Sequence, residues 1–202
     1  MKNIITICLA IFTFIAAQDT TASVNQEPQL PGWGLYVGGA FSSAASLEDL
    51  PDGHTYESRF VAPNIGISKG IFLGGIPLIV GAGYHPRGFT YEFSSYVDGS
   101  KQEADFQFDM VDFWATIPYP VSDRVILQGG FLAGTCIGAS VSGVDGAEDP
   151  DTEGELDFGI LLGGGVAITE QIGANIGYYV GLAEFDEMAK FSGIVFNVGY
   201  TF

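Results

Sequence analysis

Positively charged residues are scarce in this sequence. Lys and Arg together number 7 among 202 residues, against 24 Asp and Glu, which gives a formal net charge of −17. A chain this acidic repels phosphate groups, so we exclude nucleic acid as a partner. Divalent cations and basic proteins are compatible partners, because an acidic surface attracts positive charge.

Cysteine is also scarce, with only Cys8 and Cys136. Cys8 lies in residues 1–17, where Lys2 precedes an apolar run that ends in small residues and is followed by polar ones. This pattern is typical of a secretory signal peptide, and the run is too short to span a membrane comfortably. Cleavage of residues 1–17 would leave Cys136 as the sole cysteine, which excludes an internal disulfide.

No long apolar segment follows residue 17, so the sequence predicts no transmembrane helix. The 29 glycines also disfavour a helix-rich fold, because glycine costs about 1 kcal/mol per helical position. Residues 18–32 are polar and contain proline, which predicts a flexible lead-in. Residues 33–202 remain for one all-β domain.

The C-terminal segment 191–202 shows the pattern that organises this domain. Phe196, Val198, Tyr200 and Phe202 occupy alternate positions and are all apolar or aromatic, whereas most residues between them are small or polar. Side chains alternate across a strand, so one face is apolar throughout. Aromatic rings at a strand end suit the boundary between lipid and water. Backbone groups in lipid must all be paired, so such a sheet must close into a barrel.

Seven earlier segments repeat this alternation, with almost no charge in their apolar sets. Longer, mostly acidic connections alternate with short ones, as in outer-membrane barrels with long outer loops and short periplasmic turns. We therefore predict an all-β, eight-stranded, antiparallel, up-and-down transmembrane β-barrel in the cell outer membrane, in contact with membrane lipid and monomeric. The predicted strands are 33–42, 59–69, 76–93, 106–117, 124–141, 156–168, 172–183 and 191–202.

Two prolines are expected to disturb the strands that contain them. Pro63 lacks the N–H that a paired strand uses, so we expect a bulge there, with Val61, Ile65 and Ile67 on the outward face. Pro86 is expected to bend the 76–93 segment for the same reason. Eight strands leave an interior that side chains nearly fill, which disfavours a wide pore.

Three residues predict a charged cluster inside the barrel. Folding 76–93 and 106–117 as a hairpin places His85 and Arg87 near Asp112 on the inward face. Buried ions of opposite sign neutralise each other, so we interpret the three as interior packing. The alternative is a proton-transfer site, because His and Asp form catalytic pairs. A nucleophile beside them is missing, because Gly66-Ile67-Ser68-Lys69-Gly70 has the spacing of G-x-S-x-G but reads as part of a strand rather than as a strand-to-helix turn. We therefore predict no catalytic residue, no cofactor and no enzyme activity.

Most acidic residues lie in or beside the predicted outer loops. Asp149, Asp151 and Glu153 agree in spacing with a helix–loop–helix calcium loop, but Ile160 stands where its closing Glu should be, and both flanks read as strands. We therefore reject that motif and expect no dedicated metal site. Loose binding of Ca²⁺ or Mg²⁺ between loops stays open, beside the simpler reading that acidic loops keep the exposed face solvated.

Several short motifs occur in a familiar order. A Gly-rich segment, WGLYVGGAFSS, precedes GAGYHPRGFTYEF, then VDFWATIPYP before a short turn, and finally the aromatic-rich VFNVGYTF. This order resembles the outer-membrane β-barrel family that includes PorT-like proteins and OmpX-like small barrels. The match rests on Tyr84, Arg87, Gly88, Ile117 and Pro118, whereas Pro86 departs from it. The resemblance spans residues 33–202 and implies an outer-membrane barrel without catalytic residues, with protein secretion as the association of PorT-like members.

Several functions are compatible with these patterns. The first is a structural or interaction protein of the cell envelope that displays acidic loops and meets envelope or secretion proteins. The second is a narrow channel or transporter for small solutes, and the third is a component of an outer-membrane secretion system. A soluble lipocalin-type barrel would turn its apolar face inward, but the polar face here is too rich in glycine and too poor in charge for a solvated surface.

Overall fold

The computed structural model describes Leu30 and residues 32–46, 50–51, 53–94, 99–144, 146–185 and 189–202. The predicted signal peptide, residues 1–17, lies outside these residues, as does the predicted lead-in apart from Leu30 and Gly32. The described part of the chain contains no helix that is long and apolar enough to cross a membrane.

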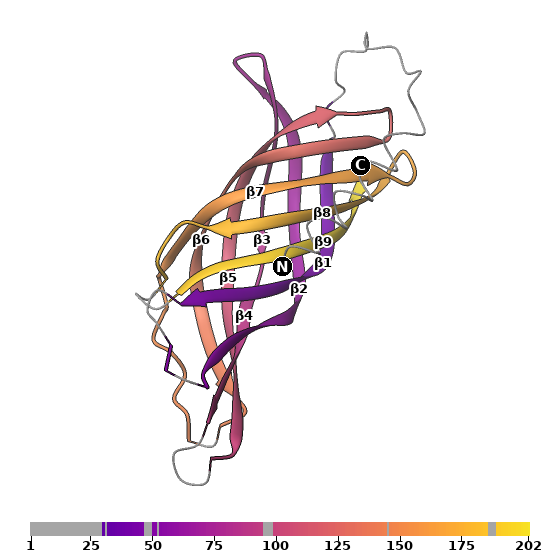
Figure 1. Ribbon diagram of the computed structural model, residues 1–202. Coiled ribbons are helices and arrows are strands. Elements are labelled where there is room, and N and C mark those ends of the chain that lie inside the picture. The colour runs from indigo at the N-terminus through magenta and orange to yellow at the C-terminus, as the bar shows by residue number, and fades with distance from the viewer. Residues whose placement is uncertain are drawn as a thin grey trace.

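Nine antiparallel strands form one sheet in the described chain (Figure 1). The sheet closes because β1 pairs with the last strand, β9, on one side and with β2 on the other. The strands are β1 (Trp33–Ser46), β2 (Thr55–Leu73), β3 (Ile76–Tyr84), β4 (Arg87–Ser94), β5 (Lys101–Pro120), β6 (Val125–Ser142), β7 (Leu156–Ala167), β8 (Ile172–Gly181) and β9 (Ala189–Thr201).

The extra strand comes from an interruption at His85 and Pro86, which divides the predicted 76–93 strand into β3 and β4. Proline has no N–H to donate to a neighbouring strand, which accounts for the break at this position. Both β3 and β4 pair with β2 on one side and β5 on the other, so they occupy one place in the ring. The barrel therefore has eight strand positions, and the predicted fold class is confirmed.

Short and long connections lie at opposite ends of the barrel (Figure 1). The short turns are Gly74–Gly75, 121–124 and 168–171, and the C-terminus lies at the same end. Gly74 and Gly75 have φ values of 59° and 85°, a left-handed conformation that tight hairpin turns require and that glycine adopts without strain. In outer-membrane barrels the short turns face the periplasm.

The outer wall of the barrel carries an apolar belt. Large apolar side chains occupy alternate positions on successive strands and are exposed, whereas their neighbours in sequence point into the lumen. This is the arrangement that lipid requires, and it is the reverse of a soluble lipocalin-type barrel. The belt includes Trp33, Leu35, Val37, Phe41, Phe113, Ile117, Tyr119, Leu127, Phe131, Ile137, Phe158, Leu162, Val166, Ile172, Ile176, Val180, Phe196, Val198 and Tyr200.

A bulge in β2 changes which residues face lipid. Gly38 pairs with Asn64 but Ala40 pairs with Val61, so β2 contains one residue more than β1 over this interval. An extra residue reverses the alternation beyond it. Phe60 is therefore outward and 50% exposed, while Val61 is 2% exposed. The predicted bulge at Pro63 is confirmed. The predicted outward position of Val61 is wrong, because that prediction continued the alternation of side chains through the bulge without a change of face.

Four strands continue beyond the rest of the barrel at the long-loop end. The pairing of β6 with β7 stops at Thr135, yet β6 stays paired with β5 as far as Ser142. On the other side, β2 stays paired with β4 as far as Thr55, beyond its last pairing with β1 at Arg59. We call this part the extension. It comprises residues 55–58 of β2, 89–94 of β4, 101–107 of β5 and 139–142 of β6.

Candidate functional site in the barrel lumen

The charged cluster in the lumen is centred on Arg87, at the start of β4. Its Nη2 donates to both carboxylate oxygens of Asp112 at 3.1 Å, and its Nε lies 3.3 Å from Oδ2 of Asp157. Tyr179 donates its hydroxyl to the same Asp157 oxygen at 2.5 Å, and its ring centroid lies 4.9 Å from the guanidinium carbon. All three charged side chains are buried. The single arginine thus offsets the cost of burying two carboxylates.

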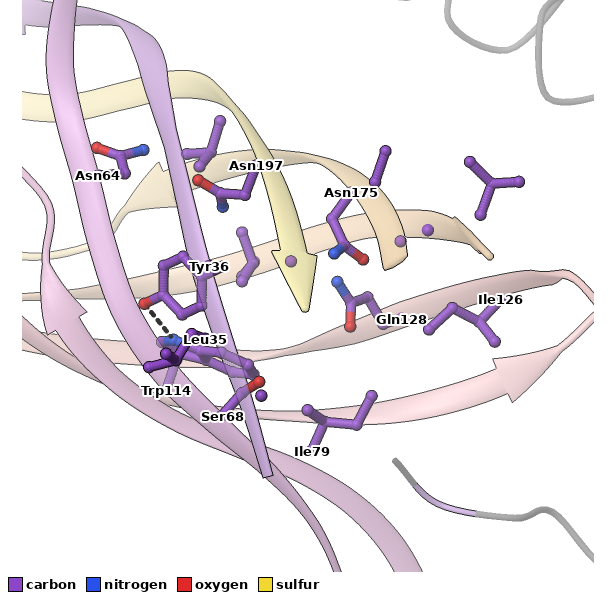
Figure 2. A pocket seen from close by; sticks show the side chains of 18 of the residues that line it. Leu35, Tyr36, Asn64, Ser68, Ile79, Trp114, Ile126, Gln128, Asn175 and Asn197 are labelled. Atoms are coloured by element: carbon purple, nitrogen blue, oxygen red, sulfur yellow. Dashed lines mark hydrogen bonds between the residues drawn. The ribbon is translucent and has the colours of Figure 1, made fainter. Parts of the chain in front are cut away.

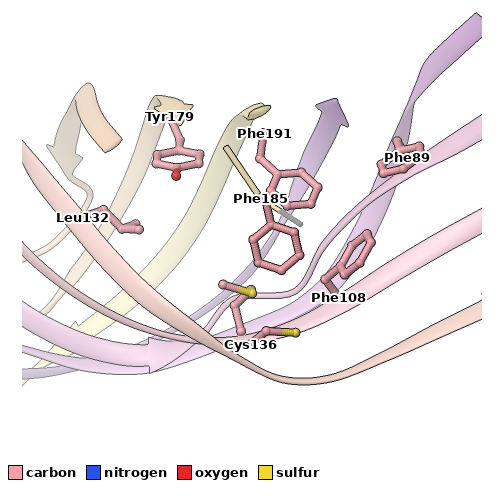
Figure 3. Packing of buried hydrophobic residues seen from close by; sticks show 8 residues of the cluster. Phe89, Phe108, Leu132, Cys136, Tyr179, Phe185 and Phe191 are labelled. Atoms are coloured by element: carbon pink, nitrogen blue, oxygen red, sulfur yellow. The ribbon is translucent and has the colours of Figure 1, made fainter. Parts of the chain in front are cut away.

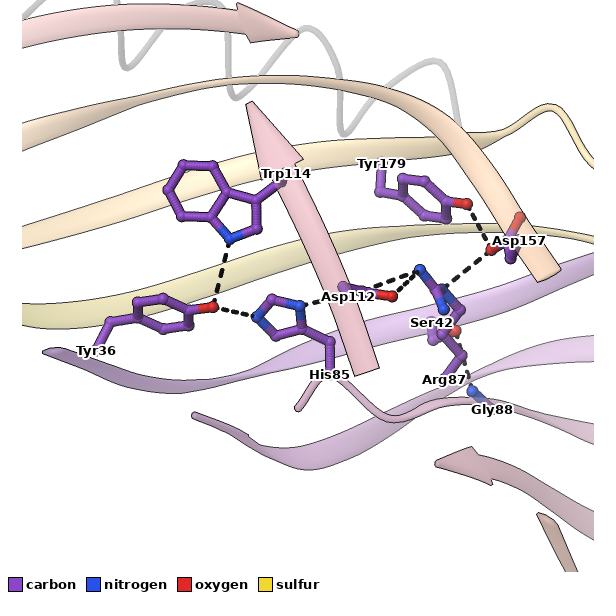
Figure 4. Close-up of polar contacts among 9 residues, drawn as sticks. All are labelled: Tyr36, Ser42, His85, Arg87, Gly88, Asp112, Trp114, Asp157 and Tyr179. Atoms are coloured by element: carbon purple, nitrogen blue, oxygen red, sulfur yellow. Dashed lines mark hydrogen bonds and ion pairs between the residues drawn. The ribbon is translucent and has the colours of Figure 1, made fainter. Parts of the chain in front are cut away.

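A second branch of hydrogen bonds leads away from Asp112. Nδ1 of His85 lies 3.0 Å from Oδ2 of Asp112, and an ionised carboxylate only accepts, so His85 donates through Nδ1. Its Nε2 can then accept from the hydroxyl of Tyr36 at 2.8 Å, and the indole N–H of Trp114 donates to that hydroxyl at 3.4 Å. Figure 4 shows the resulting chain of contacts from Trp114 to Tyr179. We call it the lumen network.

The lumen network consists of paired charges rather than of a nucleophile activated by a base. His85 contacts Tyr36 and Asp112, and Asp112 is shared with Arg87. Nearby hydroxyl and thiol groups are engaged elsewhere: Oγ of Ser42 accepts from the N–H of Gly88 at 3.1 Å, and Sγ of Cys136 contacts the carbonyl of Gly138 at 3.2 Å. Nucleophilic catalysis of the serine or cysteine type needs such a group beside the base, and among the described contacts the hydroxyl beside His85 is that of Tyr36.

Apolar side chains fill the lumen on the long-loop side of the network (Figure 3). Phe185, in the connection after β8, packs edge-on against Phe108 and Phe191, with ring centroids 5.2 and 5.1 Å away. Rings at this spacing are in direct contact. We call the set the hydrophobic plug. It comprises Phe89, Phe108, Met110, Leu132, Cys136, Tyr179, Phe185 and Phe191.

On the opposite side of the network the lumen is hollow. A cavity of about 790 Å³ extends from the network to the short-turn end, where Arg124 and Gln171 line it. Figure 2 shows that side-chain amides from several strands project into this space. They are Asn64, Gln128, Asn175 and Asn197. Among the described residues, the lumen is thus polar and hollow at the short-turn end and apolar and filled toward the long loops.

The residues considered for divalent cations do not form a common centre. Among the described residues, no group of three or more His, Cys, Asp or Glu side chains has an arrangement that could hold a metal ion. Asp149 instead accepts a hydrogen bond from the N–H of Val141 at 2.9 Å, and Asp151 and Glu153 are exposed. Loose cation binding between the loops remains a prediction.

Of the residues singled out from the sequence, His85, Arg87 and Asp112 are brought together by the fold. Sequence reasoning missed two partners. Asp157 closely follows the acidic 143–155 connection, and Tyr179 is one of many aromatic residues in the predicted strands. A signal for Asp157 was present, because it lies between the outward residues Leu156 and Phe158 and must therefore point inward. Its contact with Arg87, three strand positions away, had no signal in the sequence.

Comparison with known proteins bears on the fold. No protein-family model and no curated protein matches the sequence. The structure of Neisserial surface protein A matches with a TM-score of 0.54 and 15% identity, covering 87% of this chain and 100% of that chain. Ail, the attachment invasion locus protein of Yersinia pestis, in complex with the heparin analogue sucrose octasulfate, matches with a TM-score of 0.52 and 16% identity, covering 85% of this chain and 99% of that chain.

These identities are low, so the likeness concerns the fold alone. Together with the apolar belt, it agrees with the predicted location in the outer membrane. The chain has the fold of the small outer-membrane β-barrel proteins.

Proposed function

We propose that this chain is a closed, non-enzymatic outer-membrane barrel that acts as a structural and interaction protein of the cell envelope. The observation that carries the proposal is the hydrophobic plug, which occupies the lumen between the network and the long loops. A solute would have to displace these packed rings to pass through. The function then lies on the surfaces that the barrel displays.

The surface that favours an interaction role is the extension with the adjoining 143–155 connection. It carries many more acidic than basic side chains, and two of the acidic ones are paired: Arg59 lies 3.7 Å from Asp105 and Lys101 lies 3.4 Å from Glu92. The remaining described acidic side chains there are Glu57, Glu103, Glu148, Asp149, Asp151, Glu153 and Glu155. An excess of one charge favours a partner of opposite charge.

The comparison with Ail sharpens this proposal. Ail is described in complex with a polysulfated heparin analogue, whereas the extension of this chain would repel such a polyanion. We therefore propose a basic protein surface as the partner. PorT-like or OmpX-like identity and a role in a secretion system stay predictions, since no described residue singles them out.

Conductance tests the closed barrel. Purified, refolded protein in planar bilayers should give no steady single-channel conductance. A variant that removes the plug, Phe108→Ala with Phe191→Ala, should conduct, because the lumen then loses the rings that fill it. A matched double substitution in the lipid-facing belt, Phe113→Ala with Phe131→Ala, should stay silent. Steady conductance of the unmodified barrel would instead favour the narrow channel.

Binding of charged polymers tests the proposed partner class. Poly-lysine should bind the barrel in nanodiscs in a salt-dependent manner, and sucrose octasulfate should not bind. The variant Glu148→Gln, Asp149→Asn, Asp151→Asn, Glu153→Gln should weaken poly-lysine binding. The control Asp123→Asn with Glu170→Gln, at the short-turn end, should leave it unchanged. Equal loss in both variants would contradict a partner site on the long-loop side.

A further inference from the structure

The cavity in the short-turn half of the barrel is built for hydrogen bonding. Its wall carries the amides of Asn64, Gln128, Asn175 and Asn197, together with the hydroxyl of Ser68 (Figure 2). These groups come from β2, β6, β8 and β9, so they surround the space rather than line one side of it. A volume of about 790 Å³ lies in the range of small-molecule sites in proteins.

Several of these polar groups have no partner within the protein. Asn64 is 1% exposed, yet neither its Nδ2 nor its Oδ1 makes a hydrogen bond. Oδ1 of Asn197 and Nη1 of Arg87 are likewise buried without a partner. Leaving a buried polar group unpaired costs about 1 to 3 kcal/mol. All three residues line the cavity, and because the unpaired atoms themselves have almost no accessible area, a side-chain rotation of Asn64 or Asn197 on binding would bring them to a molecule held there.

The charges of the wall indicate which molecules fit. Arg87 is engaged with two carboxylates, and Arg124 at the short-turn end is accompanied by Asp123 and Glu170, so the wall carries no excess of positive charge for an anion. A carboxamide both donates and accepts, which matches hydroxyl groups better than it matches an ion. Trp114 and Tyr36, with ring centroids 6.4 Å apart, add apolar ring surface beside the amides. Amides combined with aromatic faces suit a neutral molecule that carries many hydroxyl groups.

We propose that the cavity is a binding site for a neutral polyhydroxylated solute of one or two sugar rings, entered from the short-turn side. Entry from the long-loop side is blocked by the hydrophobic plug. The amides of Asn64 and Asn197 hydrogen-bond the hydroxyl groups, and Trp114 contacts the ring face. The site is distinct from the acidic surface at the long-loop end and does not depend on the basic partner proposed for that surface.

Tryptophan fluorescence can test this proposal directly, because the chain has 2 tryptophans. Trp33 lies on the outward face and Trp114 lines the cavity, so Trp33→Phe leaves one reporter at the site. In nanodiscs, glucose or maltose should change the Trp114 emission saturably. Asn197→Leu, placed in the Trp33→Phe background, should weaken the apparent affinity by about tenfold or more, since it removes hydrogen bonds at constant size.

Matched variants and probes make the result decisive. Val198→Leu, one residue away on the lipid face of β9, should leave the affinity unchanged. Asn175→Leu provides a second lumen variant in case Asn197→Leu does not fold, and heat-modifiable migration on gels reports folding for each. The absence of a saturable change with both sugars, an unchanged affinity in both amide variants, or saturable binding of acetate or arginine in place of sugar would each overturn the proposal.

Discussion

Arg87 decides the charge balance of the lumen. It pairs with Asp112 and Asp157 inside the barrel, and these partners come from β5 and β7, one and three strand positions away. A buried pair of this kind contributes little net stability over an apolar substitute, but removing one partner leaves charge uncompensated. Each charged residue of the network therefore offsets part of the free-energy cost of burying the others.

Replacing the arginine alone should be severe. Arg87→Met leaves two carboxylates buried together, and we expect a loss of about 3 to 5 kcal/mol in unfolding free energy. Urea unfolding in lipid vesicles, followed by tryptophan emission, measures the loss. Adding Asp112→Asn and Asp157→Asn should recover much of it, because the charge is then removed altogether. Arg124→Met, in an exposed turn, is the control and should stay within about 0.5 kcal/mol of the unmodified protein.

Gly134 of β6 allows the carboxylate of Asp112 to lie close to the backbone of that strand. A Cβ at Gly134 would collide with Oδ1 of Asp112, whereas a Cβ at Gly138, on the same strand, would lie 4.0 Å from its nearest neighbour, Oδ2 of Asp109. Gly134→Ala should destabilise the barrel by about 1 to 3 kcal/mol through overpacking. Gly138→Ala should be close to neutral in the same urea titration. Equal effects would mean that Asp112 can move aside.

At the scale of the element, the bulge in β2 determines what the upper part of that strand presents to lipid. One extra residue relative to β1 exchanges the faces, so Phe60 joins Phe41 and Phe196 in an aromatic group on the outer wall. The ring centroids of Phe60 and Phe196 are 5.9 Å apart and the planes nearly parallel, at 9°. The same change turns Val61 toward the interior.

Labelling distinguishes this register from an unbroken alternation. Phe60→Cys should react with a lipid-soluble maleimide, and Val61→Cys should be protected, because only the first faces the bilayer. Ile65→Cys, below the bulge and outward in either case, is the positive control. Native Cys136 is buried and should contribute little background. Labelling of position 61 with protection of position 60 would refute the bulge.

For the whole molecule, the separation of short and long connections sets the orientation in the membrane. A protease site inserted at 146–149 should be cut in intact cells, because the 143–155 connection lies at the long-loop end. The same site inserted at 169–171, in the turn between β7 and β8, should be cut only after permeabilisation. Cleavage of the second insertion in intact cells would mean that the barrel has the opposite orientation and that the cavity opens on the outer side.

The sequence by itself determined the closed barrel and its lipid-facing rows. Alternation of apolar residues is a local property, and the need to pair every backbone group in lipid converts it into a closed sheet. Segments 76–93 and 106–117 follow one another in the sequence and pair as a hairpin, so the contacts of Asp112 with His85 and Arg87 could be predicted.

Only the tertiary structure decided which distant strands face one another across the lumen. The contact of Arg87 with Asp157, the folding of Phe185 into the plug and the cavity beneath the network depend on how the barrel closes and how its strands are offset. Bulges and offsets change the register by single residues, and a single residue reverses the facing of every side chain beyond it. That sensitivity is why periodicity predicts the wall of this barrel but not the contents of its interior.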